Sequence, residues 1–250
     1  MTMDTTTSPA LATHGLEVRA GARTLLLGIT ASWPARGLFA LVGANGAGKS
    51  TLLQALIGLR PAHAGEVRLL GRPLAAWKPR ALAQAIGYLP QQTHSHWDLT
   101  VEELLQLALA PPDAALIEAC ELGPLMRRRL HTLSGGEAAR AALARAIAHR
   151  PPLLLADEPA AHLDLPHQHQ LMRLLRACAA DAADAAVLVV LHDLHLAARY
   201  CDHVTLLAGG RVLAAGHPDE VLSSASLSQA YGSAVARCDL GRQSFFTAES

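Results

Sequence analysis

The sequence lacks several features that assign proteins to common classes. Its four cysteines, Cys120, Cys178, Cys201 and Cys238, are far apart and show no CxxC spacing, so neither a disulfide framework nor a cysteine zinc site is predicted. This use of cysteine favours a reducing compartment. Residues 1–12 contain no apolar core of a signal peptide, and we expect a flexible N-terminal tail there.

Long apolar runs are also lacking. A helix that spans a bilayer needs about 20 consecutive apolar residues. The best candidate, residues 25–42, is interrupted by Pro34, Arg36 and Gly37. We therefore expect that the chain does not cross a membrane by itself, and that any action at a membrane requires docking onto a separate membrane subunit.

Neither sign of charge is in excess. Lys plus Arg and Asp plus Glu both number 21, and no basic face of the kind that binds nucleic acid is indicated. With 51% apolar and 17% charged residues, the 250-residue chain has enough apolar material for a sizeable core. We predict a folded protein without a nucleic-acid partner.

The apolar pattern predicts an α/β fold. Residues 38–42 form a continuous apolar run, typical of a strand buried on both faces, and a helix over about 49–59 follows a glycine-rich loop. A capping-box pattern at Thr100 opens a helical insertion that runs to about residue 133. Further strands are expected at 16–18, 25–32, 66–70, 86–89, 153–156 and 186–191. The first two favour an antiparallel pair, and the alternation of later strands with helices favours a mainly parallel sheet.

Residues 43–51, GANGAGKST, have the pattern of a complete phosphate-binding loop. Glycines let backbone N–H groups converge on phosphate oxygens, Lys49 supplies a positive charge, and the Ser50 hydroxyl can ligate Mg²⁺. The helix that follows directs the positive end of its dipole toward the same anion. The nucleotide-binding residues expected in this segment are Gly43, Asn45, Gly46, Gly48, Lys49, Ser50 and Thr51.

Residues 153–159, LLLADEP, place two carboxylates at the end of an apolar strand. Ligands bind at this end of the strands in α/β sheets. We expect Asp157 to complete the nucleotide-binding set by holding Mg²⁺, and Glu158 to polarise the attacking water. Alone, the motif fits an ordinary strand end equally well, but its pairing with the phosphate-binding loop favours catalysis.

Residues 133–137, LSGGE, precede a predicted helix. A serine and two glycines at a helix N-terminus form a second anion-binding cap. One phosphate does not need two caps, so this one is expected to serve nucleotide held by a partner. The motif therefore predicts a dimer of two copies with nucleotide between them, although in isolation it also fits an ordinary Ser-capped helix.

Together these motifs resemble those of the ATP-binding subunits of ABC transporters, over residues 16–222. The resemblance implies a P-loop NTPase core (ABC ATPase) with a mainly parallel sheet, an antiparallel β subdomain and an inserted helical subdomain. The implied division is a single ABC ATPase domain at 13–250, with a core at 13–91 and 150–222, a helical subdomain at 92–149 and a C-terminal extension at 223–250.

The resemblance also implies roles for single residues. Gln91 matches a glutamine that ligates Mg²⁺ or the attacking water, with Gln92 as its neighbouring alternative, and His192 matches a histidine that contacts the γ-phosphate. Glu158, His192 and Gln91 are thus the expected catalytic residues, Ser50, Gln91 and Asp157 the expected Mg²⁺ ligands, and ATP and Mg²⁺ the expected cofactors. The residues expected to reach ATP or the interface across the dimer are Ser134, Gly135, Gly136, Glu137 and Asp164.

The sequence leaves the roles of several other positions undecided. The family usually stacks an aromatic on adenine near the start of the domain, but residues 18–21 contain none, so Arg19 or Arg23 is a candidate replacement. Trp97 fits an interface with a membrane subunit or core packing. Two histidine pairs have the spacing of metal ligands but no converging partners, so we expect solvated surface there: His94 with His96 and His167 with His169.

Residues 159–168 and 192–200, with Tyr231 and Gly232, resemble one importer subgroup, the ATPases for ferric-siderophore, haem and cobalamin uptake. This implies a subunit that energises import of such a metal chelate from the cytoplasmic face of a bacterial inner membrane, as a peripheral protein. The implied partners are a second copy, integral membrane permease subunits and, indirectly, a periplasmic substrate-binding protein. The alternative is a soluble ABC-type ATPase of cofactor assembly, of the iron–sulphur cluster type, without a permease.

Overall fold

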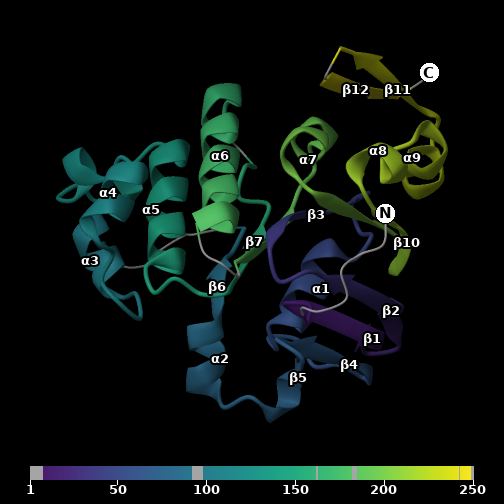
Figure 1. The fold of residues 1–250 in the computed structure, drawn as a ribbon, viewed down its shortest axis with the longest axis horizontal. Coiled ribbons are helices and arrows are strands. Elements are labelled where there is room, and N and C mark those ends of the chain that lie inside the picture. Colours follow the sequence, from purple (N-terminus) through teal and green to yellow (C-terminus); the bar gives the residue numbers. More distant parts are fainter. Residues whose placement is uncertain (1–7, 92–97, 162, 182–184, 242, 249–250) are drawn as a thin grey trace.

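The computed structural model describes residues 8–91, 98–161, 163–181, 185–241 and 243–248, which form two sheets, a hairpin and surrounding helices (Figure 1). The strands are β1 (Leu11–Ala20), β2 (Arg23–Trp33), β3 (Gly37–Gly43), β4 (Ala64–Leu69), β5 (Arg72–Pro73), β6 (Ile86–Leu89), β7 (Leu153–Asp157), β8 (Ala186–Val190), β9 (His203–Ala208), β10 (Arg211–Gly216), β11 (Val235–Leu240) and β12 (Gln243–Ala248). The α-helices are α1 (Lys49–Leu56), α2 (Pro79–Ala85), α3 (Val101–Gln106), α4 (Ala114–Ala119), α5 (Gly135–Ile147), α6 (Leu165–Asp181), α7 (Leu194–Tyr200), α8 (Pro218–Val221) and α9 (Ser224–Tyr231).

A six-stranded sheet lies at the centre of the described residues, in the order β10-β9-β3-β8-β7-β6. All neighbours pair in parallel except β9 and β10, which confirms the predicted mainly parallel sheet. Strand β3 is buried on both faces: Leu38 and Ala40 pack in one core, Phe39 and Leu41 in another. This explains why the run lacks polar alternation.

The second sheet is antiparallel, in the order β2-β1-β4-β5. It packs over α1 and the central sheet, and it confirms the antiparallel pair expected at the start of the chain. The predicted tail extended to residue 12, but β1 begins at Leu11, so the last two residues of the prediction belong to a strand. Leu11 pairs with Trp33 on one side and Leu69 on the other, and Ala10 and Leu11 are fully buried.

The helical insertion packs α3 and α4 against α5, around a small apolar core. The capping box predicted at Thr100 is present: its hydroxyl accepts from the Glu103 N–H, and the Glu103 carboxylate accepts from the Thr100 N–H at 2.7 Å. Beyond it the insertion is less continuous than the leucine pattern suggests, because α3 ends at Gln106. Leu107 and Leu109, which belong to that pattern, are 55% and 57% exposed.

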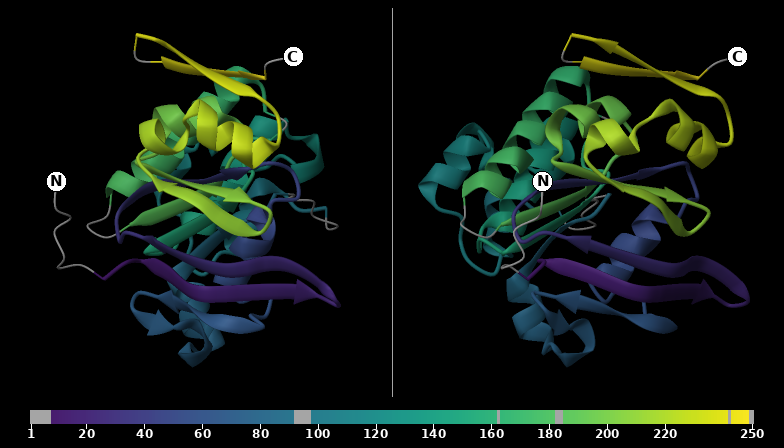
Figure 2. Two further views of the ribbon diagram at one scale, coloured as in Figure 1. Left: turned by 90° about the vertical axis from the view of Figure 1, so that its right-hand side faces the viewer. Right: turned by 45° about the vertical axis from the view of Figure 1, so that its right-hand side comes forward.

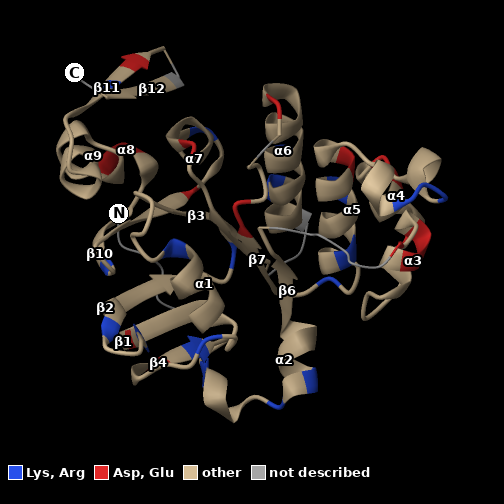
Figure 3. Ribbon diagram, turned by 180° about the vertical axis from the view of Figure 1, so that it is seen from behind, with Lys and Arg blue, Asp and Glu red and all other residues tan. Residues whose placement is uncertain are grey.

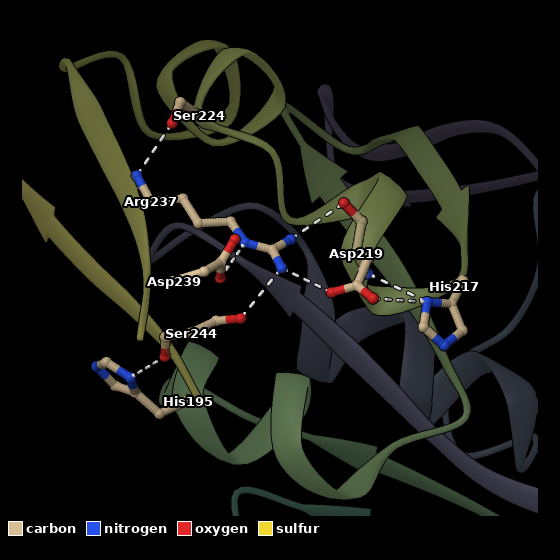
Figure 4. A network of polar contacts seen from close by, with 7 residues as sticks. All are labelled: His195, His217, Asp219, Ser224, Arg237, Asp239 and Ser244. Carbon is tan, nitrogen blue, oxygen red and sulfur yellow. Dashed lines mark hydrogen bonds and ion pairs between the residues drawn. The ribbon is translucent and has the colours of Figure 1, made fainter. Parts of the chain in front are cut away.

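The C-terminal hairpin, β11–β12, lies against α7 and α9, and both views in Figure 2 show it above the helices at the end of the fold. Arg237 holds it there (Figure 4). Its guanidinium donates to the Asp219 carboxylate at 2.6 Å, to the Asp239 carboxylate at 3.0 Å and to the Ser244 hydroxyl at 3.1 Å. On the other side of the hairpin, the His195 ring contacts the Ser244 carbonyl at 2.8 Å.

Among the described residues, no helix combines the length and the apolar character required to span a bilayer.

Candidate active site

The phosphate-binding loop connects β3 to α1. Gly48 has φ 104°, a conformation that favours glycine, and a Cβ there would also lie 2.7 Å from the end of the Leu26 side chain. Gly46 has φ 78° but open space around it. The loop is therefore held tightly at its helix end and leaves room over its middle, as a phosphate cradle requires.

Lys49 opens α1 and turns back into the loop. Its ammonium donates to the carbonyls of Gly43 and Ala44 at 2.9 and 3.2 Å, and the residue is 5% exposed. Burial lowers the pKa of Lys49, while the negative charges of Glu158 and Asp157 oppose that shift. A buried cation whose hydrogen-bond partners, within the described part of the chain, are carbonyls, and which has carboxylates nearby, fits the binding of an anionic ligand.

Asp157 ends β7, and Ser50 stands in the first turn of α1. The Ser50 hydroxyl donates to the Asp157 carboxylate at 3.0 Å. Asp157 is 3% exposed, and burial raises its pKa, although the Ser50 hydrogen bond works in the opposite direction. An oxygen pair of this kind matches the hard ligands that Mg²⁺ prefers.

Three predicted catalytic residues converge in the structure. The Glu158 carboxylate accepts from Gln91 Nε2 at 2.6 Å through one oxygen and contacts His192 Nε2 at 2.5 Å through the other. The three follow β7, β6 and β8, which are neighbours in the sheet, so parallel pairing brings their ends together. Glu158 has φ 50°, a left-handed conformation that few non-glycine residues adopt.

A cavity of about 430 Å³ adjoins these groups. Arg23 lines its wall, whereas Arg19 pairs with Glu17 at 3.2 Å and does not line it. The β9–β10 turn, at Gly209 and Gly210, also contributes and was missed from the sequence, because only strand pairing brings it to the loop. The lining residues are Arg23, Thr24, Leu25, Asn45, Gly46, Gly48, Lys49, Ser50, Thr51, Glu158, Gly209 and Gly210.

The residues predicted to act across a dimer do not line this cavity. Ser134 caps α5, accepting from the Glu137 N–H at 3.3 Å, while the Glu137 carboxylate accepts from the Ser134 N–H. Asp164 precedes α6 and is exposed. Their separation from the loop of the same chain is what a site shared between two copies requires. Gln92, His94, His96 and Trp97 lie outside the described residues.

A strand, a phosphate-binding loop and a helix, with two carboxylates at the end of a nearby parallel strand, define a P-loop NTPase. The model of the family described as ABC transporter matches residues 26–161. The chain belongs to this family. The predicted family, the fold class and the ATPase activity are confirmed, and membership implies permease partners and dimerisation in general.

Curated relatives agree. The chain is 45% identical to a hemin import ATP-binding protein HmuV of Streptomyces coelicolor, over 90% of this chain and 84% of that protein. It is 40% identical to the protein of the same name from Thermobifida fusca, over 84% and 78%. The predicted function, an ATP-hydrolysing subunit of an ABC importer, agrees with these relatives.

Solved structures share the fold. A structure described as the ATP binding subunit of an ABC transporter has a TM-score of 0.75 and 29% identity, over 85% of this chain and 91% of that one. A metal-chelate type ABC transporter in an inward-facing conformation has a TM-score of 0.80 over 97% of this chain and 98% of that one, at 22% identity.

Proposed function

We propose that this chain is the ATPase subunit of an importer that carries haem or a related metal chelate across a bacterial inner membrane. The observation that carries the ATPase chemistry is the placement of Glu158 between Gln91 and His192 beside the phosphate-binding loop. The relatives named as hemin import proteins support the substrate class.

In this proposal, the loop backbone and Lys49 bind the phosphates of ATP. Ser50 and Asp157, with Gln91, would hold Mg²⁺, which would supply positive charge to neutralise the phosphates. Glu158 orients the attacking water and accepts its proton, and His192 contacts the γ-phosphate. Catalysis of phosphoryl transfer is largely positioning and electrostatics, so these few groups suffice.

Two copies would form the complete site. Ser134 and Gly135, with the buried Gly136 in the same turn and Glu137 as the capping partner of Ser134, would face ATP bound by the opposite copy, and Asp164 would lie at the interface. The exposure of Ser134 and Gly135 in the single chain supports this arrangement, because polar groups at a helix N-terminus remain available to an anion. Asp164 is also exposed, so a second copy can reach it.

In this proposal, an apolar groove of about 380 Å³ would be the docking surface for the permease. Its lining residues come from α2 and β6 of the core, from the segment after α3 and from α5, elements that Figure 3 labels on a ribbon coloured by charge. Among its described lining residues, Arg145 is the one Lys, Arg, Asp or Glu. Leu59, Leu107 and Leu109 line it and are 69%, 55% and 57% exposed. Exposed leucines around a groove suit a short helix of a membrane subunit. This arrangement would place the chain at the cytoplasmic face, with a periplasmic substrate-binding protein as an indirect partner.

The test is affinity purification of the tagged full chain from its native membranes in mild detergent. We expect a polytopic permease with the wild-type chain, and its loss in the double variant Leu107→Glu/Leu109→Glu. Leu240→Glu is the matched control, because Leu240 is 67% exposed on the distant hairpin. Reproducible recovery of soluble scaffold proteins alone would overturn the importer proposal in favour of an assembly ATPase.

A further inference from the structure

Gly136, the second glycine of the Ser134-capped motif, is buried beneath a histidine of the same chain. A Cβ at position 136 would lie 2.7 Å from Cδ2 and 2.9 Å from Cγ of His167. Real Cβ atoms do not approach a ring so closely. Glycine at this position is therefore explained by the His167 ring, before any nucleotide is considered.

His167 is fixed from its other side by Asp164. The Asp164 carboxylate accepts from the His167 backbone N–H at 3.1 Å, and the same oxygen contacts the ring Nδ1. These hydrogen bonds hold the pKa of Asp164 below its usual value. The imidazole therefore connects the residue before α6 to the first turn of α5, and it is half-buried where the sequence suggested a solvated surface.

Neighbouring contacts continue this connection in two directions. Gln168 Nε2 donates to the Ala160 carbonyl at 3.4 Å, and the Ala161 N–H donates to the Glu158 carbonyl at 3.0 Å, so the first turn of α6 is tied to the loop of the catalytic carboxylate. Further along α5, Arg140 donates to Gln170 at 3.3 Å. Helices α5 and α6 are thus joined at successive turns, with His167 nearest the exposed cap.

We propose that His167 is a positioning residue that holds the Ser134 cap of α5 in register with Asp164 and, through the first turn of α6, with the Glu158 loop. The cap and Asp164 then present one rigid surface to the ATP of the opposite copy. The packing stands on this chain alone, whereas its effect on ATP use rests on the proposed dimer.

A stability cycle on the purified full chain tests the packing without nucleotide. We expect Gly136→Ala to lower Tm by about 3 °C or more, because the methyl group displaces the ring. In the His167→Ala background, the same substitution should be neutral or stabilising, because alanine is favoured over glycine in helices. Gly123→Ala is the control glycine, with open space around it. An equal loss of Tm in both backgrounds would refute the contact.

An ATPase assay tests the positioning. We expect His167→Ala to raise KM for ATP about fivefold, as loss of a modest coupling between two sites would, with a smaller change in kcat. His167→Asn, which keeps a flat side chain and a donor for Asp164, should restore most of the wild-type KM. His169→Ala is the matched control, because its ring faces Tyr200 at 3.0 Å. A KM for His167→Ala equal to that of His169→Ala, or no rescue by asparagine, would refute the positioning role.

The two experiments separate the possible failures. A wild-type chain without ATPase activity would contradict the proposed function, while the Tm cycle would still decide whether His167 imposes the glycine. A second outcome is an active wild-type protein, the expected result in the Tm cycle, and a KM for ATP in His167→Ala equal to that of the wild type. This outcome would leave the proposed function intact and reject the positioning role.

Discussion

The candidate active site and the Arg237 network use similar polar groups in opposite ways. At the C-terminal hairpin, the Arg237 guanidinium has three side-chain acceptors within 3.1 Å and is 14% exposed. In the candidate active site, the hydrogen-bond acceptors of Lys49 among the described residues are two backbone carbonyls, and Asp157 is buried with a hydroxyl donor from Ser50. The polar groups around Arg237 pair with one another, whereas Lys49 and Asp157 have fewer partners and can still bind a ligand.

This difference teaches which polar residues stabilise the fold and which reduce its stability in exchange for function. Burial shifts the pKa of Lys49 down and that of Asp157 up, so each charged form is disfavoured in the folded chain. The pKa of Asp239, by contrast, is lowered by its hydrogen bonds to Ser244 and Arg237. Substitutions in the two regions should therefore separate activity from stability.

The largest expected effect is on turnover. Glu158→Gln keeps the shape of the side chain but removes the negative charge that, in the proposed function, orients water, and we expect kcat to fall by roughly 100-fold or more. ATP binding and Tm should stay close to wild type. Steady-state ATPase measurement beside equilibrium nucleotide binding checks this, with Glu66→Gln as a surface control. Normal turnover would remove Glu158 from its assigned role.

The next effect is on nucleotide affinity. Lys49→Ala removes the buried cation of the phosphate-binding loop, and hydrogen bonds to charged groups are worth about 1.5–3 kcal/mol, so we expect ATP affinity to fall roughly 10- to 100-fold together with hydrolysis. Titration calorimetry measures the affinity. Lys78→Ala, in the exposed turn before α2, is the matched lysine control. Unchanged affinity would contradict the assignment.

At the hairpin, we expect a substitution to change stability more than activity. Arg237→Ala should lower the free energy of unfolding by roughly 1–2 kcal/mol, an amount reduced by the exposure of Asp219 and Asp239, while kcat changes little. Denaturant unfolding and the ATPase assay check the two halves of this prediction. Arg211→Ala, at an exposed residue at the start of β10, serves as control. A loss of activity without loss of stability would make the hairpin part of the active machinery.

The smallest effect concerns pH. Because the folded pKa of Asp157 is raised above 3.8, its ionisation costs stability as pH rises from that value through the folded pKa. Asp157→Asn should therefore stabilise the chain slightly at pH 7, while abolishing Mg²⁺-dependent hydrolysis. The stabilisation should disappear below pH 3.8, where both states of the wild type bind the proton. Unfolding curves at both pH values provide the check, and an equal difference at each would contradict it.

The phosphate-binding loop and the acidic strand end were predictable because each is a contiguous segment whose residue types state its chemistry. The convergence of Gln91, Glu158 and His192 required more, namely the order of three parallel strands, which the family resemblance supplied. The C-terminal hairpin was not predicted, because Arg237 meets Asp219 only through tertiary packing and the segment has little periodicity. The His167–Gly136 contact was missed for the same reason: a histidine pair spaced by two gives no indication of the glycine that it covers.

A left-handed backbone at Glu158 also bears on how such a chain would change over generations. Glycine, asparagine and aspartate tolerate φ 50° better than glutamate does, so a glutamate at this position carries a conformational cost, and the proposed catalytic role would explain why the cost is kept. A gene copy released from the need to hydrolyse ATP would gain stability by losing this glutamate early. The residue found there in a divergent copy would thus report whether the copy still works as a motor.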